Sequence, residues 1–271
     1  MSPSKPLFAL VALLLLATTG AAATQIKKLP FTVKKSGTYV LKKSLKFKEL
    51  TGAAITVEAP DVVIDLGGLV LSSTAPSDDT NDSVGVACSG DHRITVRNGV
   101  VRGFLRGVQL STGSAGHVRV EDLVVEGCGF RGIDVQGQSV TVRFCRVRNT
   151  GFISSGVAIN VWGILAQGDS VRVEGNQVHE LTSAGGQTLR GIQTSASRGT
   201  TAVGNEVRST QTLSAGIILF NGVANFATDN VVADCGTGLS FANGAPGKYR
   251  DNLTLNCATA FSGGTAVGSN S

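Results

Sequence analysis

The chain has 271 residues, with 24 Lys or Arg against 19 Asp or Glu, so its formal net charge is +5. It contains 35 glycines but only one tryptophan and one methionine, and Val and Asn recur where a helical protein would carry long Leu-, Ala- and Glu-rich stretches. This composition excludes a mainly helical protein and predicts an all-β chain with many tight bends.

The N-terminal segment has the layout of a secretory signal peptide. Lys5 precedes an apolar run over 7–17, and the small residues Ala21, Ala22 and Ala23 follow. The run is shorter than the ~20 residues that a membrane-spanning helix needs, and no second apolar run follows it. We therefore predict that residues 1–23 are a signal peptide, that the mature chain is secreted or periplasmic, and that it has no membrane span.

Residues 24–52 form a basic segment, which we expect to be an N-terminal cap. The rest of the chain is mildly acidic. Lysines commonly protect an exposed sheet edge, and this role is favoured over binding to nucleic acid, lipid or acidic glycan. We predict that the protein binds no nucleic acid. The lysines concerned are Lys27, Lys28, Lys34, Lys35, Lys42, Lys43, Lys46 and Lys48.

Neither the acidic loop nor the cysteines predict a metal site. The loop over 77–83 could bind Ca²⁺, but it lacks the Gly and the terminal Glu of an EF-hand loop, so a solvated insertion is favoured. The cysteines show no zinc-type spacing. Cys235 and Cys257 stand at equivalent places in adjacent repeats, within reach of a disulfide, which the sequence leaves open. We predict no cofactor.

A repeat organises the chain. A glycine followed by alternating apolar residues recurs at intervals of 22 to 31 residues. Short strands with inward apolar residues, such as Val118-Arg119-Val120, precede a second marker that runs in phase with the glycines. The glycines are Gly85, Gly107, Gly132, Gly163, Gly191, Gly216 and Gly238. The second marker is Asn98, Asp122, Cys145, Asn176, Asn205, Asn230 and Asn252, and stacked Asn residues predict an asparagine ladder.

Such short coils cannot bury their own apolar faces, so they must stack in parallel and share one interior. The sequence predicts an all-β fold, a single-stranded parallel β-helix over 53–263. We expect about eight coils with three short strands in each coil. Residues 264–271 are expected to be a flexible C-terminal tail.

With these repeats the chain resembles the right-handed parallel β-helix superfamily, which contains pectate lyases, polygalacturonases and many uncharacterised secreted proteins. Its opening strands, over 37–41, 55–57 and 62–66, are similar to those of bacterial members of the uncharacterised group. The resemblance implies a right-handed helix. The chain departs from the enzymes, because His117 is not in a Gly-His-Gly element and no paired aspartates occur on the strands.

The predicted register aligns outward side chains into columns that suit an acidic polysaccharide. Guanidinium groups bind carboxylates or sulfates bidentately, and an indole can stack on a sugar ring. Insertions over 152–161 and 181–189 are expected to form loops that border this face as walls. The first column holds Arg106, Arg131, Trp162 and Arg190, and the second holds Gln109, Asp134 and Gln193.

Another column alternates in charge, with Arg97, Glu121, Arg143 and Glu174 on consecutive coils. The spacing of the two glutamates lies near the upper limit for an inverting glycosidase. Because Arg143 stands between them, pairing of charges across strands is favoured.

Three functions are carried forward. The first is an exported monomer that binds polysaccharide along one face without an evident catalytic apparatus. The second is a polysaccharide lyase with Arg131 or Arg190 as base, or a hydrolase using Asp134, and fold analogy is its main support. The third is a structural spacer of a surface or matrix that makes contact through the basic cap.

Overall fold

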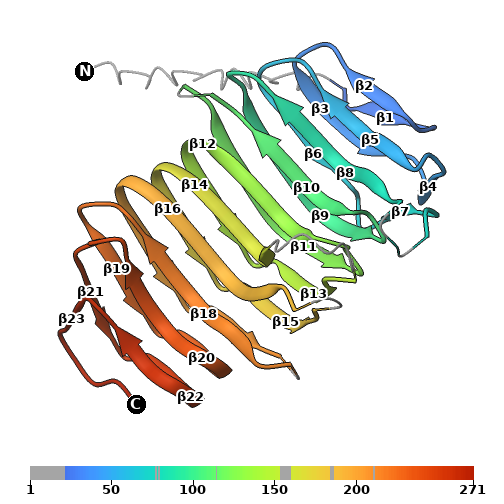
Figure 1. Cartoon of the computed structure of the whole chain (residues 1–271). Helices are drawn as coiled ribbons and strands as arrows, with labels where there is room; N and C mark the ends of the chain where they lie inside the picture. The colour runs from blue at the N-terminus through green and yellow to red at the C-terminus, as the bar shows by residue number, and fades with distance from the viewer. Residues whose placement is uncertain are drawn as a thin grey trace, which may run out of the picture.

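The computed structural model describes residues 22–76, 78, 80–113, 115–152, 160–183, 186–209 and 211–271. These residues form 23 strands, all paired in parallel, and no helix. The chain winds through about nine coils, each one turn of a β-helix, which is close to the eight predicted. Figure 1 shows the coils stacked from blue β1 to red β23. The predicted signal peptide falls almost wholly outside the described residues.

Each coil contributes strands to three parallel sheets, which we call faces 1, 2 and 3, and the predicted three-stranded coil is thereby observed. Face 1 carries the candidate site. It contains β2 (Phe31–Val33), β5 (Thr51–Val57), β8 (Asp82–Ser89), β10 (Arg106–Ser111), β12 (Arg131–Arg143), β14 (Asn160–Glu174), β16 (Thr188–Val203), β18 (Leu213–Phe220), β20 (Val231–Ala242) and β22 (Leu253–Ser262).

Several strands bend from one face into the next, so β12, β14 and β16 continue into face 2. The other strands of face 2 are β1 (Thr24–Ile26), β3 (Gly37–Leu41), β6 (Val62–Asp65), β9 (Arg93–Arg102), β11 (His117–Glu126), β19 (Asn225–Thr228), β21 (Gly247–Arg250) and β23 (Thr265–Ala266). Face 3 contains parts of β9, β11, β20 and β22 together with β4 (Leu45–Phe47), β7 (Val70–Ser73), β13 (Arg146–Thr150), β15 (Gln177–Leu181) and β17 (Glu206–Arg208).

The interior is a continuous apolar core of Val, Ile and Leu from all three faces. The repeat glycines mark where face 1 comes closest to face 3. A Cβ added to Gly132 would lie 2.4 Å from Val147 Cγ1, and one added to Gly191 would lie 2.3 Å from Val207 Cγ1. Because this close approach recurs in successive coils, a glycine recurs with it.

The cysteines of the middle coils are core residues. Cys128 and Cys145 are fully buried, and burial raises the pKa of each thiol to about 12. Since the thiolate is the reactive form, these two side chains are chemically inert.

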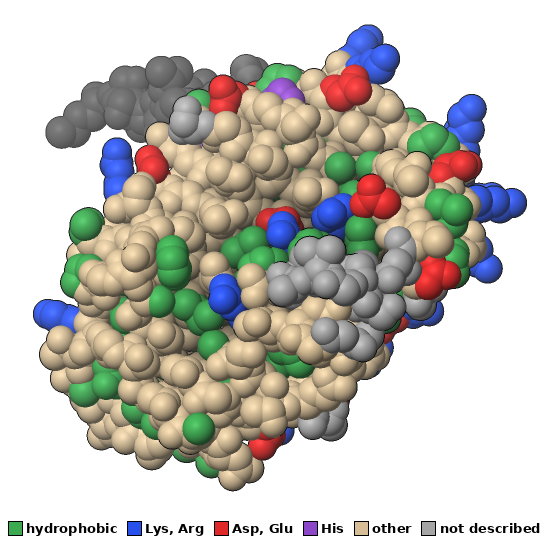
Figure 2. Space-filling view, in the orientation of Figure 1, with side chains coloured by type: hydrophobic (Ala, Val, Ile, Leu, Met, Phe, Trp, Pro, Cys, Tyr) green, Lys and Arg blue, Asp and Glu red, His purple; other side chains and the backbone are tan. Residues whose placement is uncertain are grey.

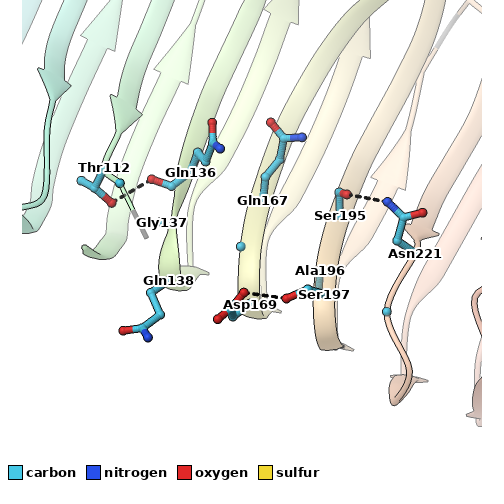
Figure 3. A pocket seen from close by; sticks show the side chains of 13 residues that line it. Thr112, Gln136, Gly137, Gln138, Gln167, Asp169, Ser195, Ala196, Ser197 and Asn221 are labelled. Atoms are coloured by element: carbon cyan, nitrogen blue, oxygen red, sulfur yellow. Dashed lines mark hydrogen bonds between the residues drawn. The ribbon is translucent and has the colours of Figure 1, made fainter. Parts of the chain in front are cut away.

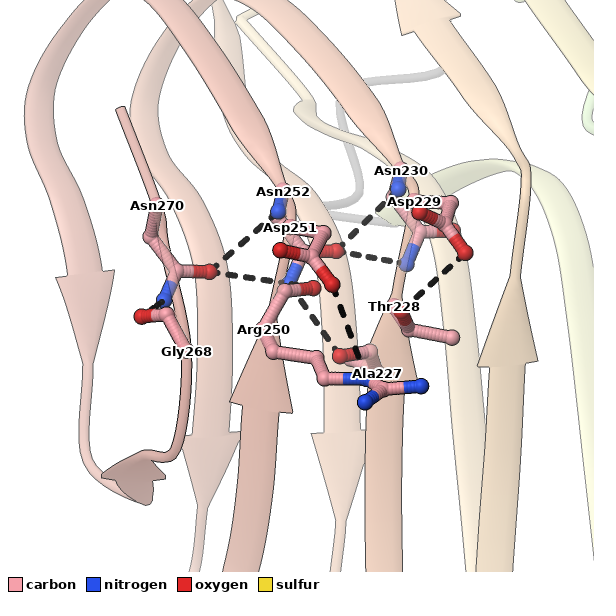
Figure 4. Close-up of polar contacts among 9 residues, drawn as sticks. All are labelled: Ala227, Thr228, Asp229, Asn230, Arg250, Asp251, Asn252, Gly268 and Asn270. Carbon is pink, nitrogen blue, oxygen red and sulfur yellow. Dashed lines mark hydrogen bonds and ion pairs between the residues drawn. The ribbon is translucent and has the colours of Figure 1, made fainter.

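An asparagine ladder runs through the C-terminal half of the stack. Asn176 Nδ2 donates to Asn205 Oδ1 at 3.0 Å, and Asn205 donates to Asn230 at 2.9 Å. The series continues through Asn252 to Asn270 (Figure 4). The amides of the four residues before Asn270 are buried, so the bonds satisfy groups that would otherwise be costly inside the protein.

The prediction that Asn98 and Asp122 belong to this ladder was wrong by one position. Both have a positive φ and are exposed, and the ladder position is the next residue, Gly99 or Leu123. Asn and Asp tolerate left-handed backbone at a turn. Asn therefore serves both at turns and in the ladder.

The alternating charges on face 2 all form ion pairs, but among the described residues only Arg143 and Glu121 pair across strands within the predicted column. Arg143 Nη2 lies 2.7 Å from Glu121 Oε2. Arg97 pairs with Asp65 on the preceding coil at 3.0 Å, and Glu174 pairs with Arg172 of its own strand at 2.8 Å. Glu121 and Glu174 are thus both held by guanidinium groups, which fits charge pairing better than a glycosidase pair.

Both ends of the described chain take part in the stack. In the basic segment all eight lysines are exposed, and β1 pairs with β3. Residues 264–271, expected to be a flexible tail, instead supply β23 and the last amide of the ladder, Asn270. No helix in the described part of the chain is long and apolar enough to cross a membrane.

Candidate binding face

The predicted columns of face 1 are aligned as expected. Arg131 pairs in register with Arg106 on one side and with Trp162 on the other, and Trp162 pairs with Arg190. The second column runs from Gln109 through Asp134 and Leu165 to Gln193. Repeat glycines therefore define the register of this face correctly from sequence.

Trp162 does not present its ring to solvent, contrary to the idea that it stacks on a sugar. Its side chain is buried with Leu105, Phe130 and Leu165 in a second apolar group, here the outer cluster, against which Phe152 packs. Trp162 is only 8% exposed. Its ring lies 5.9 Å from that of Phe130 in a T-shaped contact. The outer cluster stabilises the outside of face 1 as a small additional core.

Arg131 is held by this cluster. Its guanidinium carbon lies 4.5 Å from the Phe130 ring centroid and 4.6 Å from that of Trp162, a cation–π arrangement on both sides. Nη1 donates to Asp134. Within the described residues Nε is buried without a partner. Arg131 is therefore rigidly positioned and largely neutralised, and its buried Nε–H is unpaired among the described residues.

The remaining residues of the columns are partly engaged. Arg106 Nη1 lies 2.9 Å from Asp82 Oδ1, so this arginine is also paired. Gln193 Oε1 accepts from Arg190 Nη1 at 2.5 Å and from Trp162 Nε1 at 3.1 Å. Among the described residues Arg190 forms no ion pair. Among the described residues, Arg190 is thus the arginine of these columns whose charge no carboxylate compensates, and Gln109, in register beside Asp134, has no side-chain hydrogen bond.

Next to the columns lies an open groove of about 630 Å³ that crosses several coils, here the polar groove. Its walls come from the ends of the face 1 strands, where β12, β14 and β16 turn toward face 2 (Figure 3). The side chains that line it are amides and hydroxyls, with Asp169 as the only charged group among the lining residues: Thr112, Gln136, Gln138, Gln167, Asp169, Ser195, Ser197 and Asn221.

Some of these groups are already bonded and others are free. Ser197 donates to Asp169 at 2.6 Å, and Asn221 Nδ2 donates to Ser195 Oγ at 3.2 Å. In the described part of the chain the amides of Gln136, Gln138 and Gln167 form no side-chain hydrogen bond. Unpaired amides at the surface offer both donors and acceptors to a polyhydroxylated ligand.

Sequence reasoning missed the polar groove, although a signal was present. Gln136, Gln167 and Ser195 lie two residues after the second column on the same strands, so strand alternation places them on the same side. Figure 2 shows charged side chains gathered at the rim of this side of the molecule and in one group near its middle. Most of the intervening surface is uncharged.

The expected walls and the acidic loop lie partly outside the described residues. Of the insertion over 152–161, residues 153–159 are not described, and neither are 184 and 185 of the second insertion. Ser77 and Asp79 of the acidic loop also fall outside. Within the described residues no three His, Cys, Asp or Glu side chains come together as a metal-binding group.

Comparison with known proteins defines the family. The model of the right handed β-helix region matches residues 84–271, more than half of the chain, so the chain belongs to that family. The predicted handedness is thereby confirmed. No curated protein matches the chain in sequence.

Two solved structures share the fold. Full-length tailspike protein 2 from an Escherichia coli O157:H7 bacteriophage has 14% identity and a TM-score of 0.55, over 90% of this chain and 38% of that chain. The enzymatically active domain of tailspike protein 2 of bacteriophage CBA120 has 13% identity and a TM-score of 0.52, over 92% and 42%. The chain spans less than half the length of either, and at such identity the similarity shows the fold alone.

Proposed function

We propose that the protein is exported and binds a polysaccharide along face 1, with the polar groove as the principal contact and Arg190 as the group that favours acidic sugars. The observation that carries this proposal is the polar groove itself. It extends across successive coils, and within the described residues it offers the unpaired amides of Gln136, Gln138 and Gln167 on two adjacent coils. A long groove lined mainly by hydroxyls and amides, with Asp169 as the one charged residue of its described lining, suits an extended glycan better than a compact metabolite.

The acidic preference rests on a single guanidinium. Arg106 and Arg131 are paired with Asp82 and Asp134, so adding a ligand carboxylate there would first require breaking an ion pair. Arg190 instead bonds to a neutral amide, that of Gln193. A uronate or sulfate group at Arg190 would form a charge-assisted bond without displacing a carboxylate.

Affinity electrophoresis on dextran, dextran sulfate and polygalacturonate tests the proposal. The variant with Gln136→Ala and Gln167→Ala should lose retention by about tenfold in affinity on every polymer that binds, as expected for the loss of a few hydrogen bonds. Arg190→Gln should weaken only the acidic polymers. Gln25→Ala, at an exposed position of β1, is the matched control and should leave retention unchanged.

Unchanged retention of the groove variant on all polymers would show that face 1 is not the binding surface. If Arg190→Gln loses equal affinity for neutral and acidic polymers, Arg190 does not confer a preference for acidic sugars. The proposal that the polar groove binds polysaccharide would still stand. Export is tested separately by the mass of the mature protein recovered from a secreting host, which should lack residues 1–23.

A further inference from the structure

Face 2 has no role in the proposed function. One arginine on this face has a positive charge that no described carboxylate of the face neutralises. On this face β9, β11, β12 and β14 supply five outward arginines, and four carboxylates face them, three on β6, β11 and β14 and the fourth, Asp61, just before β6. Each carboxylate is paired with a different arginine: Asp61 with Arg93, Asp65 with Arg97, Glu121 with Arg143, and Glu174 with Arg172. Arg119 remains.

The pairing register of the strands explains why Arg119 has no carboxylate partner among the described residues. Arg172 reaches Glu174, two residues along the same strand, at 2.8 Å. The equivalent partner of Arg119 would be Glu121, but Glu121 is bound by Arg143 from the next coil at 2.7 Å. Within the described residues Arg119 forms neither an ion pair nor a side-chain hydrogen bond. Its positive charge is therefore available to a ligand.

Arg119 lines a surface hollow of about 360 Å³ together with hydrogen-bonding groups of neighbouring coils. Thr95 and Thr141 pair in register with it on either side. His117 lies two residues before it on β11, and both are exposed while the residue between them is buried, so they share one side of the strand. Ser139 pairs in register with His117.

One carboxylate, Asp61, also borders the hollow, at the end away from Arg119. Its bond with Arg93 is 2.5 Å long, and this hydrogen bond holds the pKa of Asp61 below its usual value. Asp61 thus stays ionised and is neutralised by Arg93, so the net charge at the centre of the hollow is that of Arg119.

We propose that this hollow is an oxyanion-binding site, independent of the polar groove, in which Arg119 receives a sulfate, phosphate or carboxylate group of a ligand. The guanidinium supplies two parallel donors, the geometry that such groups prefer. The hydroxyls of Thr95 and Thr141 supply further donors on both sides, and His117 adds a donor at the mouth.

Titration calorimetry at constant ionic strength with inorganic sulfate, inorganic phosphate and acetate tests the site and distinguishes the group it prefers. Arg119→Gln should reduce the affinity of the preferred anion about tenfold, the effect of losing a charge-assisted pair of hydrogen bonds. Arg119→Lys keeps the charge but not the fork and should lose less. Arg119 is exposed, so circular dichroism should show both variants folded.

Arg146→Gln is the matched control. Arg146 is also exposed and without an ion pair among the described residues, but it lies on face 3 and bonds to Gln177. Equal losses in Arg119→Gln and Arg146→Gln would indicate diffuse attraction and overturn the site, as would an unchanged affinity in Arg119→Gln. Arg119→Gln should leave retention on the neutral polymer dextran unchanged, so failure of the anion site is distinct from failure of the polysaccharide proposal.

Discussion

At the scale of single residues, Glu126 is a buried carboxylate that accepts hydrogen bonds from two arginines. It is buried on face 3, and its oxygens lie 2.5 Å from Arg102 Nε and 2.5 Å from Arg148 Nη2. Burial raises the pKa of this carboxyl, but the hydrogen bonds from Arg148 and Arg102 lower it by more, so the net pKa is below its usual value. A depressed carboxyl pKa stabilises the fold wherever the group is ionised.

This predicts a pH-dependent contribution to stability. The stabilisation by Glu126 should be fully present above the unfolded pKa of ~4.3 and should be lost as the pH falls through the lower, folded pKa. We expect Glu126→Gln to lower the free energy of unfolding at neutral pH by about 1–2 kcal/mol, since both arginines are half exposed and screened. Its stability should also fall less steeply in acid than that of the wild type.

Urea unfolding at several pH values measures both effects. Glu58→Gln is the control, because Glu58 is exposed and no ion pair involves it among the described residues. If Glu126→Gln and the wild type differ by the same free energy at every pH, the ionised carboxylate is not what stabilises this site.

Single residues also show why the sequence was informative about the columns but not about their surroundings. Inward and outward side chains alternate beside each repeat glycine, and this places Arg131, Trp162 and Arg190 in register. The alternation can be recognised from a few neighbouring residues in the sequence. Whether the indole is exposed depends on Phe130, which precedes Arg131 and packs sideways. Such side-chain packing does not repeat from coil to coil, so the sequence does not reveal it. For this reason the buried Trp162 was predicted to be an exposed ring for stacking on a sugar.

At the scale of elements, strands β20 and β22 bring two free thiols together. Cys235 pairs in register with Cys257. Adjacent strands lie about 4.8 Å apart, within the Cα separation that a disulfide spans. Burial raises the pKa of Cys235, whereas Cys257 is only half-buried. Cys257 should therefore be the thiol that reacts first.

We expect oxidised glutathione to join these two residues. The Cys257 thiolate attacks the glutathione disulfide and releases one glutathione. The Cys235 thiol then loses its proton and displaces the second glutathione, leaving a Cys235–Cys257 disulfide. Closing this loop should stabilise the last coils by about 3 kcal/mol.

Thiol titration and peptide mapping, followed by a thermal melt, measure the outcome. Two of the five thiols should disappear and Tm should rise, and Cys257→Ser should abolish both changes. Loss of two thiols in Cys257→Ser would place the disulfide elsewhere. No loss in the wild type would mean that the pair stays reduced.

At the scale of the whole molecule, the stack could be predicted because its order is periodic. The glycines define the coil, and the close approach of Gly132 to Val147 explains why they cannot be replaced by larger residues. Features that do not repeat with the coil were not predicted from the sequence, or were predicted at the wrong position. Asn98 serves a turn and not the ladder, and the polar groove arises where three strands turn together at the edge of face 1.

Periodicity also predicts that a whole coil can be removed. Ala215 pairs in register with Thr237, and Ile217 pairs with Leu239. Deleting residues 216–237 joins Ala215 to Gly238, so every later residue keeps its face and Asn205 can bond to Asn252. In a solenoid, stability is roughly a sum over neighbouring repeats. At ~0.1 kcal/mol per residue, the shortened chain should lose about 2 kcal/mol and still unfold cooperatively.

The control is a deletion of residues 216–226, which removes only part of a coil. It joins Ala215 of face 1 to Ala227 of face 2. The later strands then no longer align with their partner strands, and their apolar side chains no longer point inward. This variant should be insoluble or lack β-sheet circular dichroism, whereas the whole-coil deletion should keep its β-sheet spectrum. Equal behaviour of the two deletions would mean that the contacts of this particular coil, and not the register it maintains, hold the C-terminal stack together.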